Sequence, residues 1–225
     1  MGNNYTGIPA DLTDEYELMT KESKIIHKEA CADLPGGNTR TAVHYSPYPM
    51  YIEEGNGYNV TDVDGNEYID FFNNAKSLIH GHADEKIAEA AKQAISSDSA
   101  PGGPTKSEVK LASHLTDRIA SIEKVRFTNS GTEATLQAIR LARGYTGNST
   151  IAKFEGIYHG THGLGQISVS PPLQLAGPPE DPNSVPGSDG IHPPLVEDTV
   201  VLPFNSIEST LTKLGQYADE LAGVL

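Results

Sequence analysis

The spacing of apolar residues predicts where helices and strands lie along the chain. From Asp11 to Cys31 and from Ser206 to Leu221, apolar residues fall at broadly helical spacing with polar residues between them, which predicts an amphipathic helix in each segment. Further helices are expected at Asp84–Ile95, Lys106–Ile119 and Gly131–Arg143. Short apolar runs predict strands at Lys124–Thr128, Thr150–Phe154 and Thr199–Leu202, and Ala222–Leu225 has the composition of another strand's first residues.

Turn residues divide these elements. Between Tyr51 and Phe72 the turn signals Glu54-Gly55-Asn56-Gly57 and Asp64-Gly65-Asn66 separate short β-rich runs, which predicts a small antiparallel meander. Pro35-Gly36-Gly37-Asn38 predicts a loop. Residues 171–194 are dominated by Pro, Gly, Asp and Ser, which predicts a long surface excursion without elements of its own.

The order of elements from Lys124 to Phe154 is strand, helix, strand. This order is typical of a parallel βαβ unit, so the sequence predicts an α/β fold with a mainly parallel sheet. At 225 residues, the chain is long enough to bury a substantial core.

The amino-acid composition limits which classes of molecule this protein is expected to bind. The chain has 16 Lys and Arg against 30 Asp and Glu, a formal net charge of −14. This charge repels nucleic-acid phosphates and anionic lipid headgroups, so we expect neither a nucleic-acid nor a membrane partner. Cys31, the single cysteine, has no second cysteine in the chain for a disulfide, and Met1-Gly2-Asn3-Asn4 is polar. No stretch approaches the roughly 20 apolar residues of a membrane span, and we expect a soluble, cytoplasmic protein.

The segment Phe127–Ala134 carries the strongest chemical signal, because a predicted strand ends there and a predicted helix begins. The backbone N–H groups in the first turn of a helix are unpaired and attract negative charge. The Ser and Thr hydroxyls of this segment add further donors, so the segment is suited to bind a phosphate. Ser130 and Glu133 also match the capping box S-x-x-E, which many helices use for stability alone. The bare pattern leaves both interpretations open and favours the cap.

Further motifs favour the phosphate site over the helix cap alone, because together they resemble the class-III aminotransferases over nearly the whole chain. The matching stretches are Leu34–Arg40, Asp62–Asp70, His80–His82, Arg126–Ala134, Ile139–Arg143 and Phe154–Gly160. The order and spacing are most similar to the branch that contains glutamate-1-semialdehyde 2,1-aminomutase and the β-amino-acid aminotransferases. The resemblance implies fold type I of the pyridoxal-phosphate-dependent transferases. Residues 1–75 would then form an N-terminal helix and meander of a small domain, and residues 76–225 an incomplete cofactor-binding large domain.

The resemblance also assigns roles to individual residues. It implies that Ser130, Gly131 and Thr132 hold the phosphate of pyridoxal 5'-phosphate, while Tyr158 stacks on the pyridine ring and the adjacent His159 belongs to the same cofactor site. Arg40 would bind a substrate carboxylate, for which a guanidinium offers paired donors. A solvated surface arginine is the alternative for Arg40.

The sequence also suggests two other kinds of site. His80, His82, His159 and His162 suggest a metal site, but no HExxH or CxxC pattern accompanies them, and we expect no metal. A nicotinamide-nucleotide site would need the three spaced glycines of GxGxxG, which Asn129-Ser130-Gly131 lacks.

The catalytic lysine is the missing part of the pattern. Pyridoxal chemistry needs a Schiff-base lysine, which the family places further along, so we expect no catalytic residue in this chain and no activity from it alone. Lysines 86, 92, 106, 110 and 213 lie among polar residues of predicted helices, and Lys153 is the nearest but unfavoured substitute.

The sequence therefore predicts a fragment of a transaminase that exchanges an amino group between an amino acid and an oxo acid, a homodimer when full length. An aminomutase is the alternative within the family. A non-catalytic module that binds a phosphorylated ligand or pairs with a related subunit is the alternative outside it.

Overall fold

The computed structural model describes residues 9–225, so the polar start Met1–Asn4 lies outside the described residues. The chain divides into two compact units, the first ending at Thr105 and the second beginning at Lys106. The boundary between residues 75 and 76 concerns the domains of the whole family fold and stays a prediction.

The first unit begins with two helices where the sequence predicts one. α1 spans Ala10–Met19 and α2 spans Lys21–Asp33. The helix breaks at Thr20 (φ −122°, ψ 48°), and the Asp64 carboxylate accepts a hydrogen bond from the N–H of Glu22 at 2.6 Å. The single helix predicted from Asp11 to Cys31 is wrong, because its break depends on a carboxylate 42 positions further along the chain, which local spacing does not reveal.

The rest of the first unit contains a small sheet and short helices. The 3₁₀ turns are η1 (Pro35–Gly37) and η2 (Thr41–Val43), and the strands are β1 (Ile52–Asn56), β2 (Asn59–Asp62) and β3 (Glu67–Ile69). The strands pair antiparallel in the order β1-β2-β3, which confirms the predicted meander. α3 (Asn73–Lys76) and α4 (Glu85–Ser97) follow. Asp84 caps α4 by accepting from the N–H of Ile87 at 3.0 Å.

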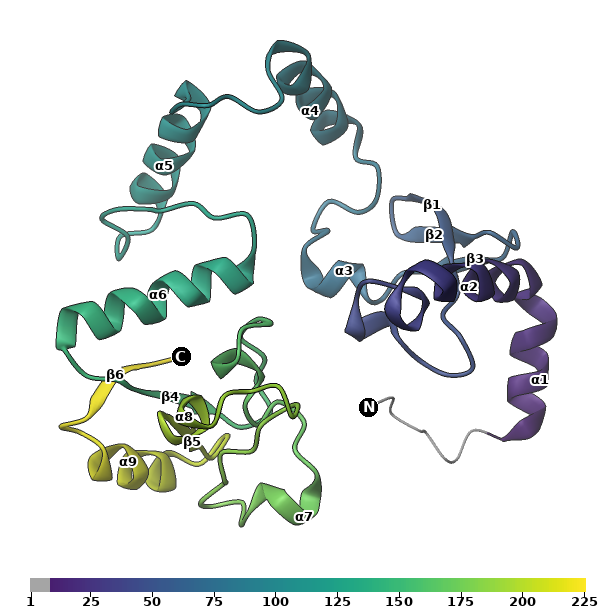
Figure 1. The fold of residues 1–225 in the computed structure, drawn as a ribbon. Helices are drawn as coiled ribbons and strands as arrows, with labels where there is room; N and C mark the ends of the chain where they lie inside the picture. Colours follow the sequence, from purple (N-terminus) through teal and green to yellow (C-terminus); the bar gives the residue numbers. More distant parts are fainter. Residues whose placement is uncertain (1–8) are drawn as a thin grey trace. The chain divides into compact units, whose positions relative to one another are not determined.

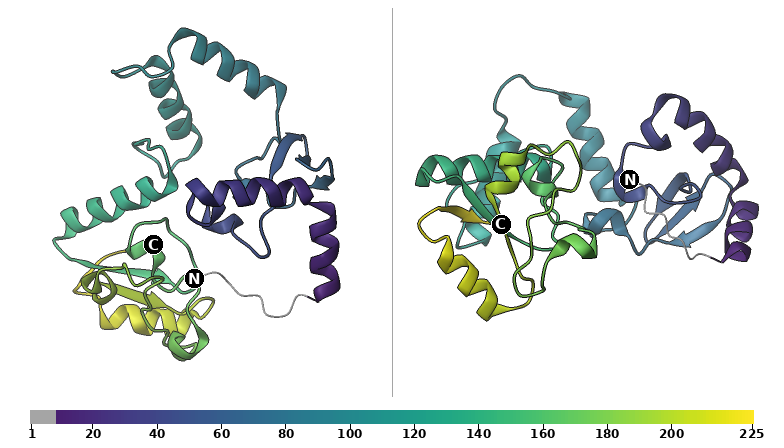
Figure 2. Two further views of the ribbon diagram at one scale, coloured as in Figure 1. Left: turned by 45° about the vertical axis from the view of Figure 1, so that its right-hand side comes forward. Right: turned by 60° about the horizontal axis from the view of Figure 1, so that its bottom comes forward.

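The second unit is a parallel sheet covered by helices on both faces (Figures 1 and 2). Its strands are β4 (Thr150–Phe154), β5 (Thr199–Leu202) and β6 (Leu221–Val224), in the order β5-β4-β6. Its helices are α5 (Lys106–Arg118), α6 (Gly131–Thr146), α7 (Leu173–Ala176), α8 (Pro193–Glu197) and α9 (Ile207–Gln216), with the 3₁₀ turn η3 (Leu164–Gln166). Both strand pairs are parallel, so the predicted α/β class is confirmed.

Alternation along β4 sends its side chains into two cores. Ile151 packs with Ile139 of α6 and Leu164 on one face, while Ala152 packs with Val200 on the other face, against Leu214 of α9. This period of two is the reason that one strand can bury residues on both faces of the sheet. The sheet consequently fixes the position of α6 and of the segment that follows β4.

Two predicted elements of the second unit differ from the structure. Lys124–Thr128 is not a strand, because no described strand lies beside it to supply ladder hydrogen bonds; the predicted βαβ unit therefore lacks its first strand. The helix predicted from Ser206 to Leu221 ends at Gln216. It ends early because Leu221 leaves the helix and pairs with Thr150 in the sheet.

The predicted excursion at 171–194 is mostly irregular but is not confined to the surface. It includes α7 and the start of α8, and Pro182 and Val185 are buried. Lys213, expected to be solvated, is instead largely buried and donates to the carbonyl of Pro182 at 2.8 Å. The excursion is therefore anchored to α9 by this lysine.

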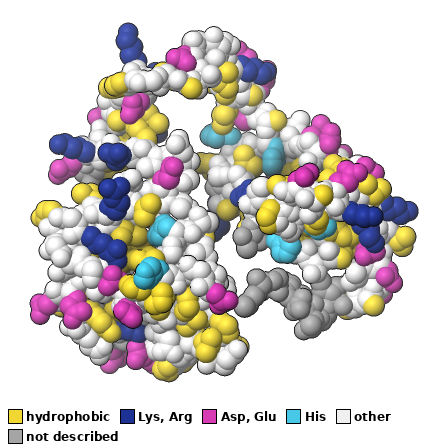
Figure 3. Space-filling view, viewed as in Figure 1, with side chains coloured by type: hydrophobic (Ala, Val, Ile, Leu, Met, Phe, Trp, Pro, Cys, Tyr) yellow, Lys and Arg dark blue, Asp and Glu magenta, His cyan; other side chains and the backbone are white. Residues whose placement is uncertain are grey.

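Both units leave large apolar side chains at the surface, shown in yellow in Figure 3. Phe71 and Tyr145 are each 91% exposed, and Leu141 is 74% exposed. Among the described residues, no helix has the length and apolar character to cross a membrane.

Candidate functional site

The N-terminus of α6 combines a helix cap with donors left for a ligand. Ser130 has extended backbone angles, and its hydroxyl accepts from the N–H of Glu133 at 3.1 Å. The Glu133 carboxylate accepts from the N–H of Asn129, one residue before the N-cap, at 2.7 Å, so the serine cap is formed and the glutamate reaches back one residue beyond the capping-box position. The first-turn N–H groups of Gly131 and Thr132 have no acceptor within the helix, and a methyl group at Gly131 would meet no atom within 4 Å. The cap and an anion site are therefore compatible.

The segment after β4 packs directly on this helix end. Gly160 has a φ of +111°, and a Cβ there would lie 2.8 Å from the Cα of Thr132. The N–H of Thr161 donates to the Thr132 hydroxyl at 3.2 Å. Only glycine permits this approach at this backbone angle. The sheet and the glycine thus bring the segment that carries Tyr158 and His159 against the first turn that carries Thr132.

Tyr158 and His159 differ in their surroundings. The Tyr158 side chain is 54% exposed, so a large part of the phenol is open to a ligand. The Nε2 atom of His159 is buried and has no hydrogen-bond partner among the described residues. Burial lowers the pKa of His159 below its usual range, and the neighbouring positive charge of Lys153 lowers it further. His159 is therefore a neutral imidazole at pH 7 with a polar atom left unsatisfied.

Lys153 on β4 is buried rather than available for reaction. Its side chain has no exposed surface, and its ammonium donates to the carbonyl of Ile167. Burial lowers the pKa of Lys153 from 10.5 to about 8. A lower pKa favours a nucleophilic amine, but a lysine enclosed by the sheet does not reach a ligand at the surface.

Arg40 lies in the first unit, in the loop after η1. Its backbone N–H donates to the Asn38 side chain at 2.9 Å, and its Nη1 donates to the Asn74 side chain at 2.8 Å. Asn74 belongs to a left-handed turn in which Asn73 and Lys76 also have positive φ angles, a conformation that costs free energy in non-glycine residues. The guanidinium is exposed and keeps further donors for a ligand.

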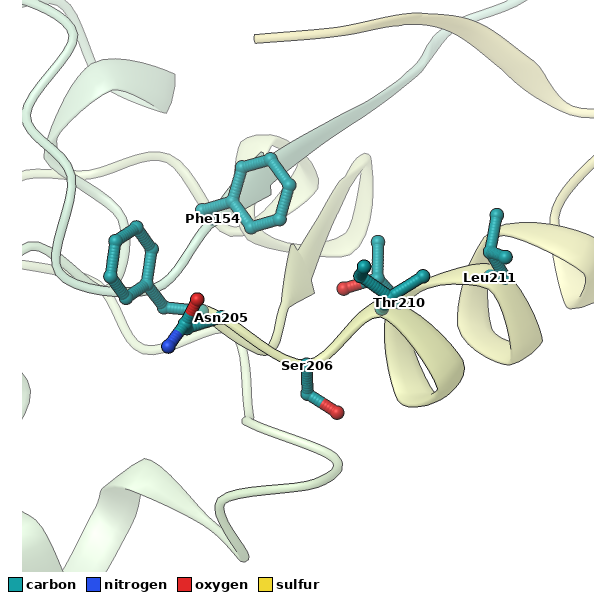
Figure 4. A pocket seen from close by; sticks show the side chains of 7 residues that line it. Phe154, Asn205, Ser206, Thr210 and Leu211 are labelled. Carbon is teal, nitrogen blue, oxygen red and sulfur yellow. The ribbon is translucent and has the colours of Figure 1, made fainter.

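An apolar hollow lies at the carboxyl ends of β4 and β5 (Figure 4). Its volume is about 310 Å³, and its lining includes Phe154, Phe204, Ile207 and Leu211. The rings of Phe154 and Phe204 meet edge to face with centroids 6.5 Å apart. Ligands of open α/β sheets commonly bind beyond the carboxyl ends of the strands, and both the hollow and Tyr158 lie beyond that end of β4.

The histidines that suggested a metal site are divided between the two units. His80 and His82 belong to the first unit and His159 and His162 to the second. His82 instead contacts the Asp70 carboxylate at 2.7 Å. Within residues 9–225, no group of three or more His, Cys, Asp or Glu side chains is arranged to hold a metal ion.

Thr135 carries no motif in the sequence, and the sequence indicated His162 only as a metal-site candidate. The hydroxyl of Thr135 contacts the carbonyl of His159 at 2.6 Å and Nε2 of His162 at 3.0 Å. Thr135 is one turn beyond Gly131, on the side of α6 that carries Thr132, which is the only sequence signal that could have indicated it. Nothing in the local pattern indicates that His162 folds back onto α6.

Comparisons with known proteins agree with this geometry. The family model described as aminotransferase class-III matches residues 40–183. The glutamate-1-semialdehyde 2,1-aminomutase 2 of Halalkalibacterium halodurans is 43% identical over 195 residues, which cover 85% of this chain and 44% of that protein. The chain thus spans about half the length of the curated relatives it matches.

Solved structures show the same likeness. An omega-transaminase from Sphaerobacter thermophilus matches with a TM-score of 0.84 and 44% identity, covering 90% of this chain and 46% of that one. A transaminase solved with PLP bound matches with a TM-score of 0.81 and 42% identity, covering 91% and 46%. The chain belongs to the class-III aminotransferase family.

Proposed function

We propose that the second unit binds pyridoxal 5'-phosphate at the N-terminus of α6. The N–H groups of Gly131 and Thr132, with the hydroxyl of Ser130, would bind the phosphate at the positive end of the helix dipole. Tyr158 would cover one face of the pyridine ring, since its exposed phenol offers a large area for stacking. His159 would stand beside the ring, with its unsatisfied Nε2 available to the ligand. The observation that carries the proposal is the packing of Gly160 on Thr132, which joins the two halves of this site.

The chemistry of the whole protein follows from the family. Pyridoxal phosphate, when bound, supplies an aldehyde and an electron-withdrawing ring that stabilises negative charge on a substrate carbon. The residues of this chain hold and orient the ring and phosphate, and Arg40 would bind the substrate carboxylate through donors that Asn74 leaves free. The whole protein would then transfer an amino group between an amino acid and an oxo acid. None of these residues transfers the amino group itself.

A second activity is an aminomutase reaction, in which the amino group moves within one molecule. The observation that favours it is the 43% identity to a glutamate-1-semialdehyde 2,1-aminomutase. The 44% identity to an omega-transaminase supports the first activity equally. We further propose that the whole protein is a cytoplasmic homodimer, and exposed apolar residues such as Phe71 and Tyr145 support the pairing of subunits.

The phosphate site is tested with a variant that keeps the cap and changes the charge. Ser130→Asp retains a cap acceptor but places a carboxylate beside the phosphate. Two like charges 4 Å apart repel by about 1 kcal/mol in water and about 4 kcal/mol near a protein surface, so affinity should fall at least about fivefold. The matched control is Ser206→Asp, which adds the same charge at the N-terminus of α9, where the serine makes no cap hydrogen bond.

The ligand for this titration is pyridoxamine 5'-phosphate, which has the same ring and phosphate but no aldehyde to react with surface lysines. Binding by the unmodified chain and by Ser206→Asp, with loss in Ser130→Asp, supports the proposal. Equal affinity in all three proteins would place the phosphate elsewhere.

A further inference from the structure

Thr135 lies at the centre of a small group of polar contacts on α6. Its hydroxyl oxygen is 2.6 Å from the carbonyl of His159, 3.0 Å from Nε2 of His162, and 3.0 and 3.1 Å from the carbonyls of Gly131 and Thr132. A hydroxyl has only one hydrogen to donate. The carbonyls of Gly131 and Thr132 already accept from helical N–H groups, so we assign the hydrogen to His159, the shortest contact.

The surroundings of His162 determine which of its nitrogens carries the proton. The N–H of Gly165 donates to Nδ1 of His162 at 3.2 Å, so Nδ1 presents a lone pair. The neutral ring therefore carries its hydrogen on Nε2, which donates to the Thr135 hydroxyl. Burial lowers the pKa of His162 below its usual range, in agreement with a neutral ring.

These contacts form a closed circuit of hydrogen bonds with one direction. Gly165 N–H donates to His162, His162 to Thr135, and Thr135 to the carbonyl of His159. The N–H of His159 then donates to the carbonyl of Gly165 at 3.4 Å. The circuit ties the segment after β4 to the second turn of α6, immediately beside the contact between Gly160 and Thr132.

We propose that Thr135 and His162 are positioning residues that hold Tyr158 over the ring of a cofactor whose phosphate binds at Ser130–Thr132. The inference rests on the proposed function. Neither side chain touches the cofactor; each acts through the backbone of His159, the neighbour of Tyr158. Removing the circuit should therefore weaken binding of the ring and leave binding of phosphate alone unchanged.

The matched variants are Thr135→Val, which keeps the shape and removes the hydroxyl, and Thr135→Ser, which keeps the hydroxyl. We expect Thr135→Val to bind pyridoxamine 5'-phosphate about tenfold more weakly, equivalent to about 1.4 kcal/mol, and Thr135→Ser to restore most of the affinity. Thr146→Val is the control in the same helix, because it removes a hydroxyl that contacts the carbonyl of Ala142 at 2.9 Å at the other end of α6.

Two further readouts separate positioning from general damage to the fold. Inorganic phosphate, measured as a competitor, should keep its affinity in Thr135→Val. In a Tyr158→Ala background, Thr135→Val should cause no additional loss, because the ring that it positions is absent. Long-range ¹⁵N correlation spectra should show an unprotonated Nδ1 in His162.

Each outcome bears on the inference. Equal affinity of Thr135→Val and Thr135→Ser, a parallel loss of phosphate binding in Thr135→Val, a full additional loss in the Tyr158→Ala background, or a proton on Nδ1 of His162 would overturn it. A failure of the proposed function is visible separately, because the unmodified chain would then not bind pyridoxamine 5'-phosphate at all, and the inference would fall with it.

Discussion

Lys153 should make the stability of the second unit depend on alkaline pH. The perturbation is Lys153→Met, which keeps a long apolar side chain in β4 and removes the amino group. Lys153 is fully buried and has its pKa lowered from 10.5 to about 8. The unfolded chain therefore binds more protons than the folded chain between these two values, and stability rises with pH in that window.

The expected magnitude follows from the two pKa values. They differ by about 2.5, and each pKa unit corresponds to about 1.36 kcal/mol, so the full rise is about 3 kcal/mol. Below pH 8 Lys153 is protonated in both the folded and the unfolded chain, so its contribution to the free energy of unfolding does not change with pH. Between pH 7.5 and pH 10, the unmodified protein should gain about 2–3 kcal/mol in free energy of unfolding relative to Lys153→Met.

The assay is urea unfolding followed by far-ultraviolet circular dichroism at several values of pH from 7.5 to 10. Taking the difference between the two proteins cancels groups that titrate alike in both, including tyrosines. Lys110→Met removes a lysine from the exposed surface of α5 and should show no comparable dependence on pH. A difference between the unmodified protein and Lys153→Met that stays constant from pH 7.5 to pH 10 would refute the reasoning.

Two other predictions concern the packing and titration of the site. Gly160→Ala should destabilise the second unit by about 2–4 kcal/mol in thermal unfolding, because its Cβ would meet the backbone of Thr132 at 2.8 Å. The control Gly156→Ala, also at a positive φ but with open space around it, should cost about 1 kcal/mol. Equal losses of stability in the two variants would contradict the close approach of Gly160 to Thr132. The pKa values of His159 and His162 are both lowered in the folded state from 6.5, so stability should be complete above about pH 6.5 and decline as pH falls through the folded values. Replacing both histidines by glutamine should reduce the decrease in free energy of unfolding as the pH falls. An unchanged decrease would count against the burial of the two histidines.

Periodicity predicted two strands of the parallel sheet and located α4, α5 and α6 to within a few residues. The strands Thr150–Phe154 and Thr199–Leu202 match the structure residue for residue, because buried strands leave continuous apolar runs. The start of α6 at Gly131 was also predictable, since the capping box of Ser130 and Glu133 is a local signal.

Long-range contacts explain what could not be predicted. The break at Thr20 depends on Asp64, and Lys124–Thr128 is not a strand because strand formation requires a partner that no local pattern specifies. Likewise, the family resemblance assigned Ser130 and Tyr158 to one cofactor site, but the contact that joins their two segments depends on Gly160, whose glycine requirement appears only when the segments meet.

The central claim is that this chain carries a binding wall for pyridoxal phosphate but no lysine that reacts with it. The most direct measurement is to mix the chain with pyridoxal 5'-phosphate, reduce with borohydride, and locate any adduct by peptide mass spectrometry. We predict reversible binding, visible in the absorption spectrum, with no stoichiometric adduct at a single lysine, because Lys153 is enclosed by the sheet and bonded to Ile167. A stoichiometric, single-site adduct at Lys153 or any other lysine would contradict the account.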